Sequence, residues 1–295
     1  MVTDASTGST VPRRQLGRQL RDLRQQAGLT LKAAAATLEF SETKMWRIET
    51  GQTVMRTLDV EQMCRIYGAP EDATKYLMSI AKQTRDKAWW FSYGDVIVLG
   101  FDLYLGLEEA AARLSWYEAN LVPGLLQTRN YARTLIREDN PDLSFIEIER
   151  RVDLRVARQR LLRRSFNAPD LHVVLDEAIM HRPVGSTEVM VEQLKLLLKL
   201  GDLPNVSLRV VRYAAGVHRG LLSGPFVLLD FPLNVNGQPS EPSTVYVDGF
   251  AGSLYLDRPH EVERYSSAFT KLWDEAENEK DSATIIYQTA KGLEN

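Results

Sequence analysis

Residues 41–51 combine charged, hydroxyl-bearing and apolar side chains at helical spacing, in the order SETKMWRIETG. On a helix, Met45 and Ile48 would face one side, and residues 42–44 and Arg47 would face the other. The polar set suits hydrogen bonding to the base edges of DNA. Arginine can donate two hydrogen bonds to guanine, and glutamate can accept one from cytosine. The methyl group of threonine can contact that of thymine. We therefore predict that the base-contacting residues are Glu42, Thr43 and Arg47.

The elements before this stretch would position it. Leucines at every third or fourth position predict a helix over residues 14–27, and Gly28 would end it. Thr30 can cap a second helix over residues 31–38. A short turn then leads to Ser41, a plausible cap for the third helix. Two short helices joined by a tight turn form a helix-turn-helix, whose second helix lies in the major groove. Plain helical bundles also contain such pairs, so the pattern alone leaves that alternative open.

Charge and cysteine content narrow the class of protein. Residues 13–56 hold nine Lys/Arg and four Asp/Glu, a net of +5, so the total of −3 leaves −8 for the rest. A basic module on an acidic body is typical of a DNA-reading domain attached to a larger soluble one.

Cys64 is the only cysteine, which excludes an internal disulfide or a zinc cage of cysteines and indicates a reducing cytoplasm. No stretch reaches the roughly 20 apolar residues that cross a bilayer, so no membrane partner is expected.

The stretch LRDLRQQAGLTLKAAAATLEFSETKMWRIETG resembles the Xre, or phage-repressor, type of helix-turn-helix. The positions that match the family pattern are Arg24, Gly28, Leu29, Thr30, Ala35, Ser41, Met45, Ile48, Glu49 and Gly51. The resemblance implies a structural ion pair between Arg24 and Glu49, which would orient the arginine toward phosphate. One position departs from the family, because many relatives carry glutamine where this chain has Leu31. The phosphate contacts that we predict are Arg18, Arg24, Lys32, Ser41 and Lys44.

The remainder predicts a different architecture. A fourth helix with Leu58, Met63 and Ile66 as apolar contacts would complete the head with a fifth helix. Helical patterns continue beyond an aromatic connector, notably over residues 107–120, and then short β-branched runs alternate with turns. We predict an all-α helix-turn-helix domain followed by an α+β domain, helices first and then a small mixed sheet with flanking helices. The predicted segments are a disordered tail (1–11), the DNA-binding domain (12–82), the connector (83–106), the α+β domain (107–280) and a C-terminal helix (281–295).

Several residues of the second domain invite a functional interpretation. Trp116 and Tyr117 begin a segment dense in aromatics, which could contact a ligand or simply pack an αα-corner with Tyr131. Arg155 and Arg158 belong to an arginine-rich helix that could be a solvated, salt-bridged face, a second nucleic-acid contact or a surface for an acidic partner. His218 lies in a glycine-containing loop and is at best a ligand contact.

An enzyme is the weakest interpretation. Asp176 and Glu177, with His181 and Arg182 nearby, could suggest acid–base chemistry, but no nucleophile accompanies them. The four histidines form no motif at metal-ligand spacing. We therefore expect no catalytic residues, no metal ligands and no cofactor.

Four further segments resemble the C-terminal domain of actinobacterial WhiJ-like regulators, also described as Scr-type antitoxin-like regulators. They read WYEANLVPGLLQTRNYARTLI, LHVVLDEAIMHRPVG, LPNVSLRVVRYAAGVHRGLLSGPFVLLDF and VYVDGFAGSLYLDRP. The resemblance implies a nucleoid-associated, cytoplasmic regulator of development or antibiotic production. Its body would dimerise, or bind a ligand or a small acidic BldB-like protein. The alternative is an antitoxin that neutralises a small partner and binds double-stranded DNA for autoregulation.

Overall fold

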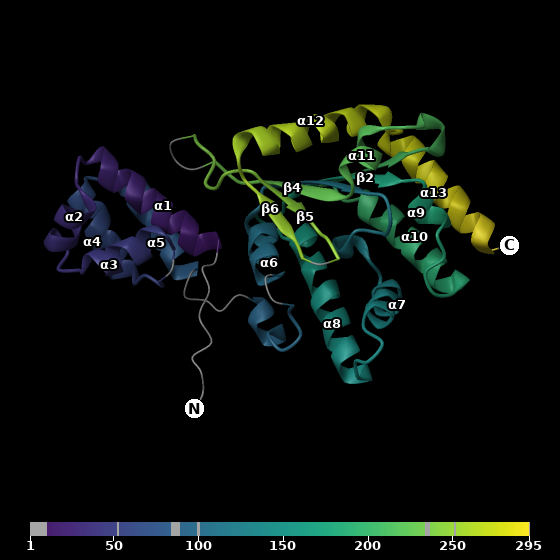
Figure 1. Ribbon diagram of the computed structural model, residues 1–295, viewed down its shortest axis with the longest axis horizontal. Helices are drawn as coiled ribbons and strands as arrows, with labels where there is room; N and C mark the ends of the chain where they lie inside the picture. The colour runs from purple at the N-terminus through teal and green to yellow at the C-terminus, as the bar shows by residue number, and fades with distance from the viewer. Residues whose placement is uncertain are drawn as a thin grey trace. The chain divides into compact units, whose positions relative to one another are not determined.

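The computed structural model describes residues 11–51, 53–83, 89–98, 101–233, 237–250 and 252–294. The predicted tail lies outside these residues, apart from Val11. The chain divides into two compact units: Met1–Phe91 with Leu105–Ala110 and Leu233–Ser240, and Ser92–Tyr104 with Ala111–Pro232 and Glu241–Asn295. We call residues 11–83 the head, and we call the described part of the second unit, which contains the sheet, the body (Figure 1).

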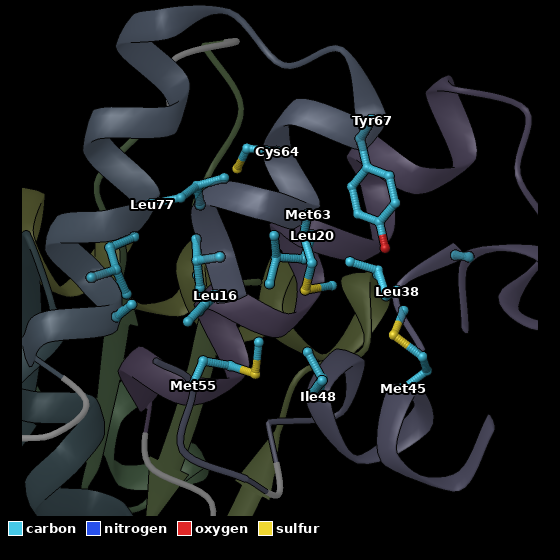
Figure 2. Close-up of a cluster of buried hydrophobic side chains, with 14 of the residues drawn as sticks. Leu16, Leu20, Leu38, Met45, Ile48, Met55, Met63, Cys64, Tyr67 and Leu77 are labelled. Atoms are coloured by element: carbon cyan, nitrogen blue, oxygen red, sulfur yellow. The ribbon is translucent and has the colours of Figure 1, made fainter. Parts of the chain in front are cut away.

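The head is a bundle of helices, in chain order α1 (Val11–Gln26), α2 (Leu31–Thr37), α3 (Glu42–Glu49), α4 (Thr57–Tyr67) and α5 (Glu71–Gln83). Figure 2 shows its core, in which Leu16 and Leu20 of α1 meet Met45, Ile48 and Met63 from α3 and α4. All five side chains are at most 2% exposed. Burial of this shared core, rather than helix propensity, holds such short helices in place.

One predicted contact of the head is wrong. Leu58, expected to face the core from α4, is 71% exposed. The buried face of α4 instead starts at Val60 and continues through Met63, Cys64 and Tyr67 at steps of three, one and three residues. Leu58 precedes this stripe by two positions, which on a helix is more than half a turn, so its side chain faces solvent.

Among the described residues of the body, six strands form one mixed sheet in the order β3-β2-β1-β4-β5-β6. The strands are β1 (Arg113–Glu118), β2 (Asp170–Asp176), β3 (Val206–Val211), β4 (Phe226–Asp230), β5 (Thr244–Val247) and β6 (Leu254–Leu256). β1 pairs in parallel with β2 and β2 with β3, whereas β4, β5 and β6 are added antiparallel. The strand that comes first in the chain is therefore central in the sheet.

Helices cover both faces of the sheet. The described α-helices that follow the head are α6 (Phe101–Ala110), α7 (Arg129–Asp139), α8 (Phe145–Ala157), α9 (Ala178–His181), α10 (Thr187–Gly201), α11 (Arg219–Ser223), α12 (Pro259–Glu275) and α13 (Glu279–Glu294), and the last six residues of α6 belong to the first compact unit. Short 3₁₀ helices are η1 (Trp89–Tyr93), η2 (Gly124–Leu126), η3 (Arg158–Arg163) and η4 (Tyr213–Ala215). In Figure 1, α12 crosses one face of the sheet, and α8 and α10 lie on the other side.

The predicted fold class is confirmed, but one element is wrong. Residues 107–120 were expected to be helical, and they contain the end of α6 and the whole of β1. The αα-corner around Trp116 is therefore also wrong, because Trp116 lies in a strand. Neighbours on both sides and both faces bury β1 from Leu114 to Tyr117. Such a strand lacks the alternation of apolar and polar residues that distinguishes a strand from a helix.

Candidate nucleic-acid interface

The start of α3 is fixed by a turn and a cap. Glu39 takes a left-handed conformation (φ 55°), and the amide of Phe40 bonds back to the carbonyl of Ala35 at 2.9 Å. This closes α2 and reverses the chain. Ser41 then caps α3, because its hydroxyl oxygen accepts a hydrogen bond from the amide of Lys44 at 3.1 Å. The helix therefore begins at a defined residue, with Glu42 in its first turn.

The inner face of α3 packs closely on α1. Met45 and Ile48 are 0% and 1% exposed within the core. A Cβ atom at Gly17 of α1 would lie 2.3 Å from the carbonyl oxygen of Ile48, and one at Gly51 would lie 2.6 Å from Cα of Arg14. Gly51 also has a φ of +70°, which favours glycine. Glycines at these two positions let the backbone of α1 come close to the C-terminal end of α3. This close contact sets the orientation of α3.

A buried ion pair joins α1 to the end of α3. Arg24 donates from Nε to Oε1 of Glu49 at 2.6 Å and from Nη2 to Oε2 at 2.9 Å. Its Nη1 donates to the carbonyl oxygen of Leu29 at 2.6 Å. Arg24 and Glu49 are 7% and 3% exposed. The hydrogen bonds that Arg24 donates to Glu49 raise the pKa of Arg24, and burial together with the charge of Glu49 raises the pKa of the adjacent Tyr67. Arg24 thus acts as a clamp within the head.

The outer face of α3 carries the residues predicted to contact bases. Glu42, Thr43 and Arg47 are all exposed. Trp46 lies beside them and is 49% exposed, so neighbouring helices cover only part of its side chain. Lys44 is also exposed, and its Nζ lies 3.2 Å from the ring centroid of Phe40, a cation–π contact. The structure brings these side chains together on one helix, opposite the packed face.

The residues predicted to contact phosphate occupy different environments. Lys32 at the start of α2 is exposed, as is Ser41 at the start of α3. Arg18 on α1 is only partly exposed, and Arg24 is buried in its pair with Glu49. The exposed members therefore lie at the N-terminal ends of α2 and α3, where the helix dipole and free backbone amides favour an anion.

The five candidates in the body separate into two groups. Trp116, Arg155 and Arg158 line one cavity, on the side of the sheet that faces α8. Arg158 is only 4% exposed, so the solvated face predicted for the arginine-rich helix does not include it. Tyr117 follows Trp116 in β1 and points to the opposite face, where it packs in a cluster with Phe269 of α12.

His218 lies with Tyr117 on the α12 side. Its ring meets the ring of Tyr117 edge-on with centroids 6.0 Å apart, and its Nε2 lies 3.5 Å from a carboxylate oxygen of Asp176. His218 lies in the loop between η4 and α11, as expected from the sequence, and its side chain is buried there, at 5% exposed. The residues weighed for acid–base chemistry are also separated. His181 lies 3.9 Å from Glu177, while Asp176 faces His218 instead.

Sequence reasoning missed Glu118. It ends β1 and lines the same cavity as Arg155, and burial raises the pKa of its carboxyl group to about 7. The residue was overlooked because its segment was predicted to be helical. The signal available was the aromatic run Trp116-Tyr117 followed by turn residues, which favours a strand end.

The described residues hold no group of three or more His, Cys, Asp or Glu side chains placed to bind a metal ion. Within the same residues, no helix is both long and apolar enough to span a bilayer.

The geometry of the head is that of a helix-turn-helix, and comparison with known families agrees. A family described as a helix-turn-helix domain matches residues 15–77. By class, the chain is therefore a DNA-binding regulator.

A second family model, described as a domain of unknown function (DUF5753), matches residues 101–288, more than half of the chain. The chain belongs to this family. No curated protein and no solved structure gives a significant match.

Proposed function

We propose that the chain is a sequence-specific transcription regulator that inserts α3 into the major groove of double-stranded DNA. The observation that carries this proposal is the division of α3 into two faces. Met45, Ile48 and Glu49 are buried and fix the helix. Glu42, Thr43 and Arg47 are exposed from the same helix and carry the groups that read base edges.

Phosphate contacts would hold the head in register. Exposed Lys32 and Lys44 stand at the starts of successive helices, and Ser41 lies beside them. Arg18 would add a contact from α1. The net charge of +5 over residues 13–56 supports attraction to the DNA backbone. These contacts position the head but do not read sequence.

The body would determine when the head binds. Helix-turn-helix proteins commonly bind two half-sites about one helical turn apart as dimers, and we infer a homodimer here. The resemblance to Xre-type and WhiJ-like regulators supports a role in development or antibiotic production, in the nucleoid. It also supports control by a ligand or a small acidic BldB-like protein. The alternative, an antitoxin with autoregulatory DNA binding, predicts that a stable complex with such a partner is its main activity.

Groove docking is tested by measuring how strongly Arg47 variants prefer one base pair over the others at a single operator position. In Arg47→Ala, we expect a loss of about 1–3 kcal/mol in affinity for the selected operator and relaxed preference at a single position. Arg47→Lys keeps the charge but loses the bidentate fork, so it should also relax that preference. The matched control is Lys75→Ala, which removes one exposed positive charge from α5, a helix that carries none of the residues proposed to contact DNA.

The operator would first be selected from random duplexes, and affinities then measured at fixed salt. Equal weakening on every sequence, with Arg47→Lys restoring affinity, would make Arg47 a phosphate contact. If Arg47→Ala bound the operator as tightly as the Lys75→Ala control, docking through α3 would be wrong.

A further inference from the structure

Trp46 is a large apolar side chain on the exposed face of α3. Among the described residues of the head, the large apolar side chains that are exposed are Trp46, Val54 and Leu58, and of these only Trp46 belongs to the helix proposed to enter the groove. Trp46 is 49% exposed, whereas Met45 and Ile48 of the same helix are at most 1% exposed. An isolated exposed apolar residue is ordinary, but this one lies within the surface proposed to bind DNA.

The indole of Trp46 has no specific partner within the described part of the chain. It makes no hydrogen bond and no aromatic or cation–π contact with another described residue. Its backbone is fixed, because its carbonyl oxygen accepts hydrogen bonds from the hydroxyl of Thr50 at 2.7 Å and from the amide of Thr50 at 2.9 Å. A rigid backbone therefore carries a ring that leaves half of its surface in water.

The position of Trp46 brings its ring toward the residues proposed to read bases. Glu42 and Thr43 lie four and three residues before it, which on a helix is the same side one turn earlier. Helical side chains lean toward the N-terminus, so the indole extends over the turn that carries these two residues. That turn begins after the cap Ser41, and the N-terminal residues of a recognition helix are those that contact base edges.

The two flanks of α3 carry different chemistry. Lys44 and Trp46 are two positions apart, which places them about 160° apart around the helix. A helix in the major groove has a different wall of the groove on each side, so these two side chains would meet different groups. The charge of Lys44 suits a phosphate. The neutral ring of Trp46 suits an apolar group instead.

The base edges of the major groove offer such a group only at thymine. Its C5-methyl group projects into the groove, whereas the other base-edge groups are hydrogen-bond donors and acceptors. A neutral ring that covered phosphate oxygens would remove water from charged groups without replacing it, which is costly. Removing water from both the indole and a methyl group is favourable.

We propose that Trp46 contacts the methyl group of one thymine in the operator and is a further residue that determines specificity. The inference rests on the proposed docking of α3, and it adds a base preference at a position other than the one assigned to Arg47. Uracil pairs as thymine does and lacks only the methyl group, so it is the probe of this contact.

The experiment replaces each thymine of the selected operator with uracil, one at a time, and measures affinity at fixed salt. At the position of Trp46, uracil should weaken binding about fourfold, which corresponds to about 0.8 kcal/mol for one methylene-sized group. Trp46→Ala should bind the thymine operator at least fourfold more weakly and should lose the uracil effect at that position. Trp46→Phe keeps an apolar ring and should retain part of it. Thr43→Ser, which removes only a methyl group, should act at a different thymine.

Leu58→Ala is the matched control. It removes another exposed large apolar side chain, 71% exposed on α4, from a helix that carries none of the residues proposed to contact DNA. We expect it to leave every uracil effect unchanged. Urea unfolding of each variant establishes that the head remains folded.

Fluorescence gives a measurement that does not depend on affinity. The chain has five tryptophans, so the difference between the emission of the parent and that of Trp46→Phe isolates Trp46. When saturating operator is added, this difference should shift to shorter wavelength, because the indole leaves water.

Three results would overturn the proposal. They are unchanged operator affinity in folded Trp46→Ala, uracil effects that persist at every position in that variant, or no thymine at which uracil weakens binding of the parent. In the second case, weaker binding overall would place the ring on the sugar–phosphate wall. Arg47→Ala, measured alongside, separates this inference from the proposed function. If Arg47→Ala keeps full affinity, docking through α3 fails and the Trp46 contact fails with it, whereas an effect of Arg47→Ala without one of Trp46→Ala removes only the Trp46 contact.

Discussion

Glu49→Gln would leave the guanidinium of Arg24 buried without its counter-charge. The two side chains are 8% and 4% exposed, and their closest atoms are 2.6 Å apart. Removing one partner of such a buried pair costs about 3–5 kcal/mol. Because a glutamine oxygen can still accept one hydrogen bond from Arg24, we expect a cost near the lower end, about 3 kcal/mol. Typical domains have only about 5–15 kcal/mol of stability, so the head should lose a large part of its own.

Urea denaturation of the full-length chain, followed by helical circular dichroism, measures this cost in the transition of the head. Glu42→Gln is the matched control, because it makes the same change on the exposed face of α3 and should stay within about 0.5 kcal/mol of the parent. The double variant Arg24→Met/Glu49→Leu replaces both charges with apolar groups and should recover most of the loss. A cost below about 1 kcal/mol for Glu49→Gln, typical of a surface ion pair, would refute the reasoning.

The same double variant decides whether Arg24 also contacts phosphate. Three of its N–H groups already donate within the head. A phosphate contact would contribute about one unit to the slope of log affinity against log salt. We expect that slope to be unchanged in the double variant. A decrease of about one would show that Arg24 both clamps α3 and binds the backbone.

Three other predictions follow from the geometry. The carboxyl of Glu118 has an ordinary pKa of 4.5 and a pKa of about 7 in the fold, so the folded body holds more protons between these values and loses stability as pH rises through them. Glu118→Gln should therefore stabilise the chain at pH 8 by at most about 3.5 kcal/mol, at about 1.4 kcal/mol per pKa unit, and by much less near pH 4; equal effects at both pH values in thermal melts would exclude a buried acid. Gly17→Ala should destabilise the head by about 1–3 kcal/mol, because its methyl group would meet the carbonyl of Ile48, and unchanged urea unfolding would contradict this close approach. Tyr117→Phe removes a buried hydroxyl that has no hydrogen-bond partner among the described residues, so stability should stay constant or rise by about 1 kcal/mol; a comparable loss in denaturation would mean that the hydroxyl is bonded.

The head could be predicted closely because its signals are local. Thr30 and Ser41 each cap the helix that follows, and Gly28 ends α1 with a φ of +69°. Such signals act over three or four residues and can be read from the sequence. The buried face of α4 was less predictable. Leu58 and Val60 are both apolar, and only the packing of neighbouring helices determines which of them is covered.

The body was harder because its central features depend on distant partners. Trp116 and Tyr117 are adjacent in sequence and lie on opposite faces of the sheet, but this follows only once β1 is known to be a strand. Arg155 and Arg158 look like members of a solvated helix, since arginine usually is exposed. They turn inward because α8 gives way to η3 at Arg158, and because Gly124 leaves room for both guanidinium groups. Neither cause is visible in the sequence of the helix itself.

The two faces of α3 imply that stability and specificity can change independently. The residues that fix the helix, Met45, Ile48 and Glu49, are buried against other helices of the head. The residues proposed to read bases project from the other face and make no contribution to that core. Substitutions at Glu42, Thr43 or Arg47 should therefore alter the preferred operator while leaving unfolding unchanged within about 0.5 kcal/mol. Related regulators could diverge in target sequence by this route without any change in the fold of the head.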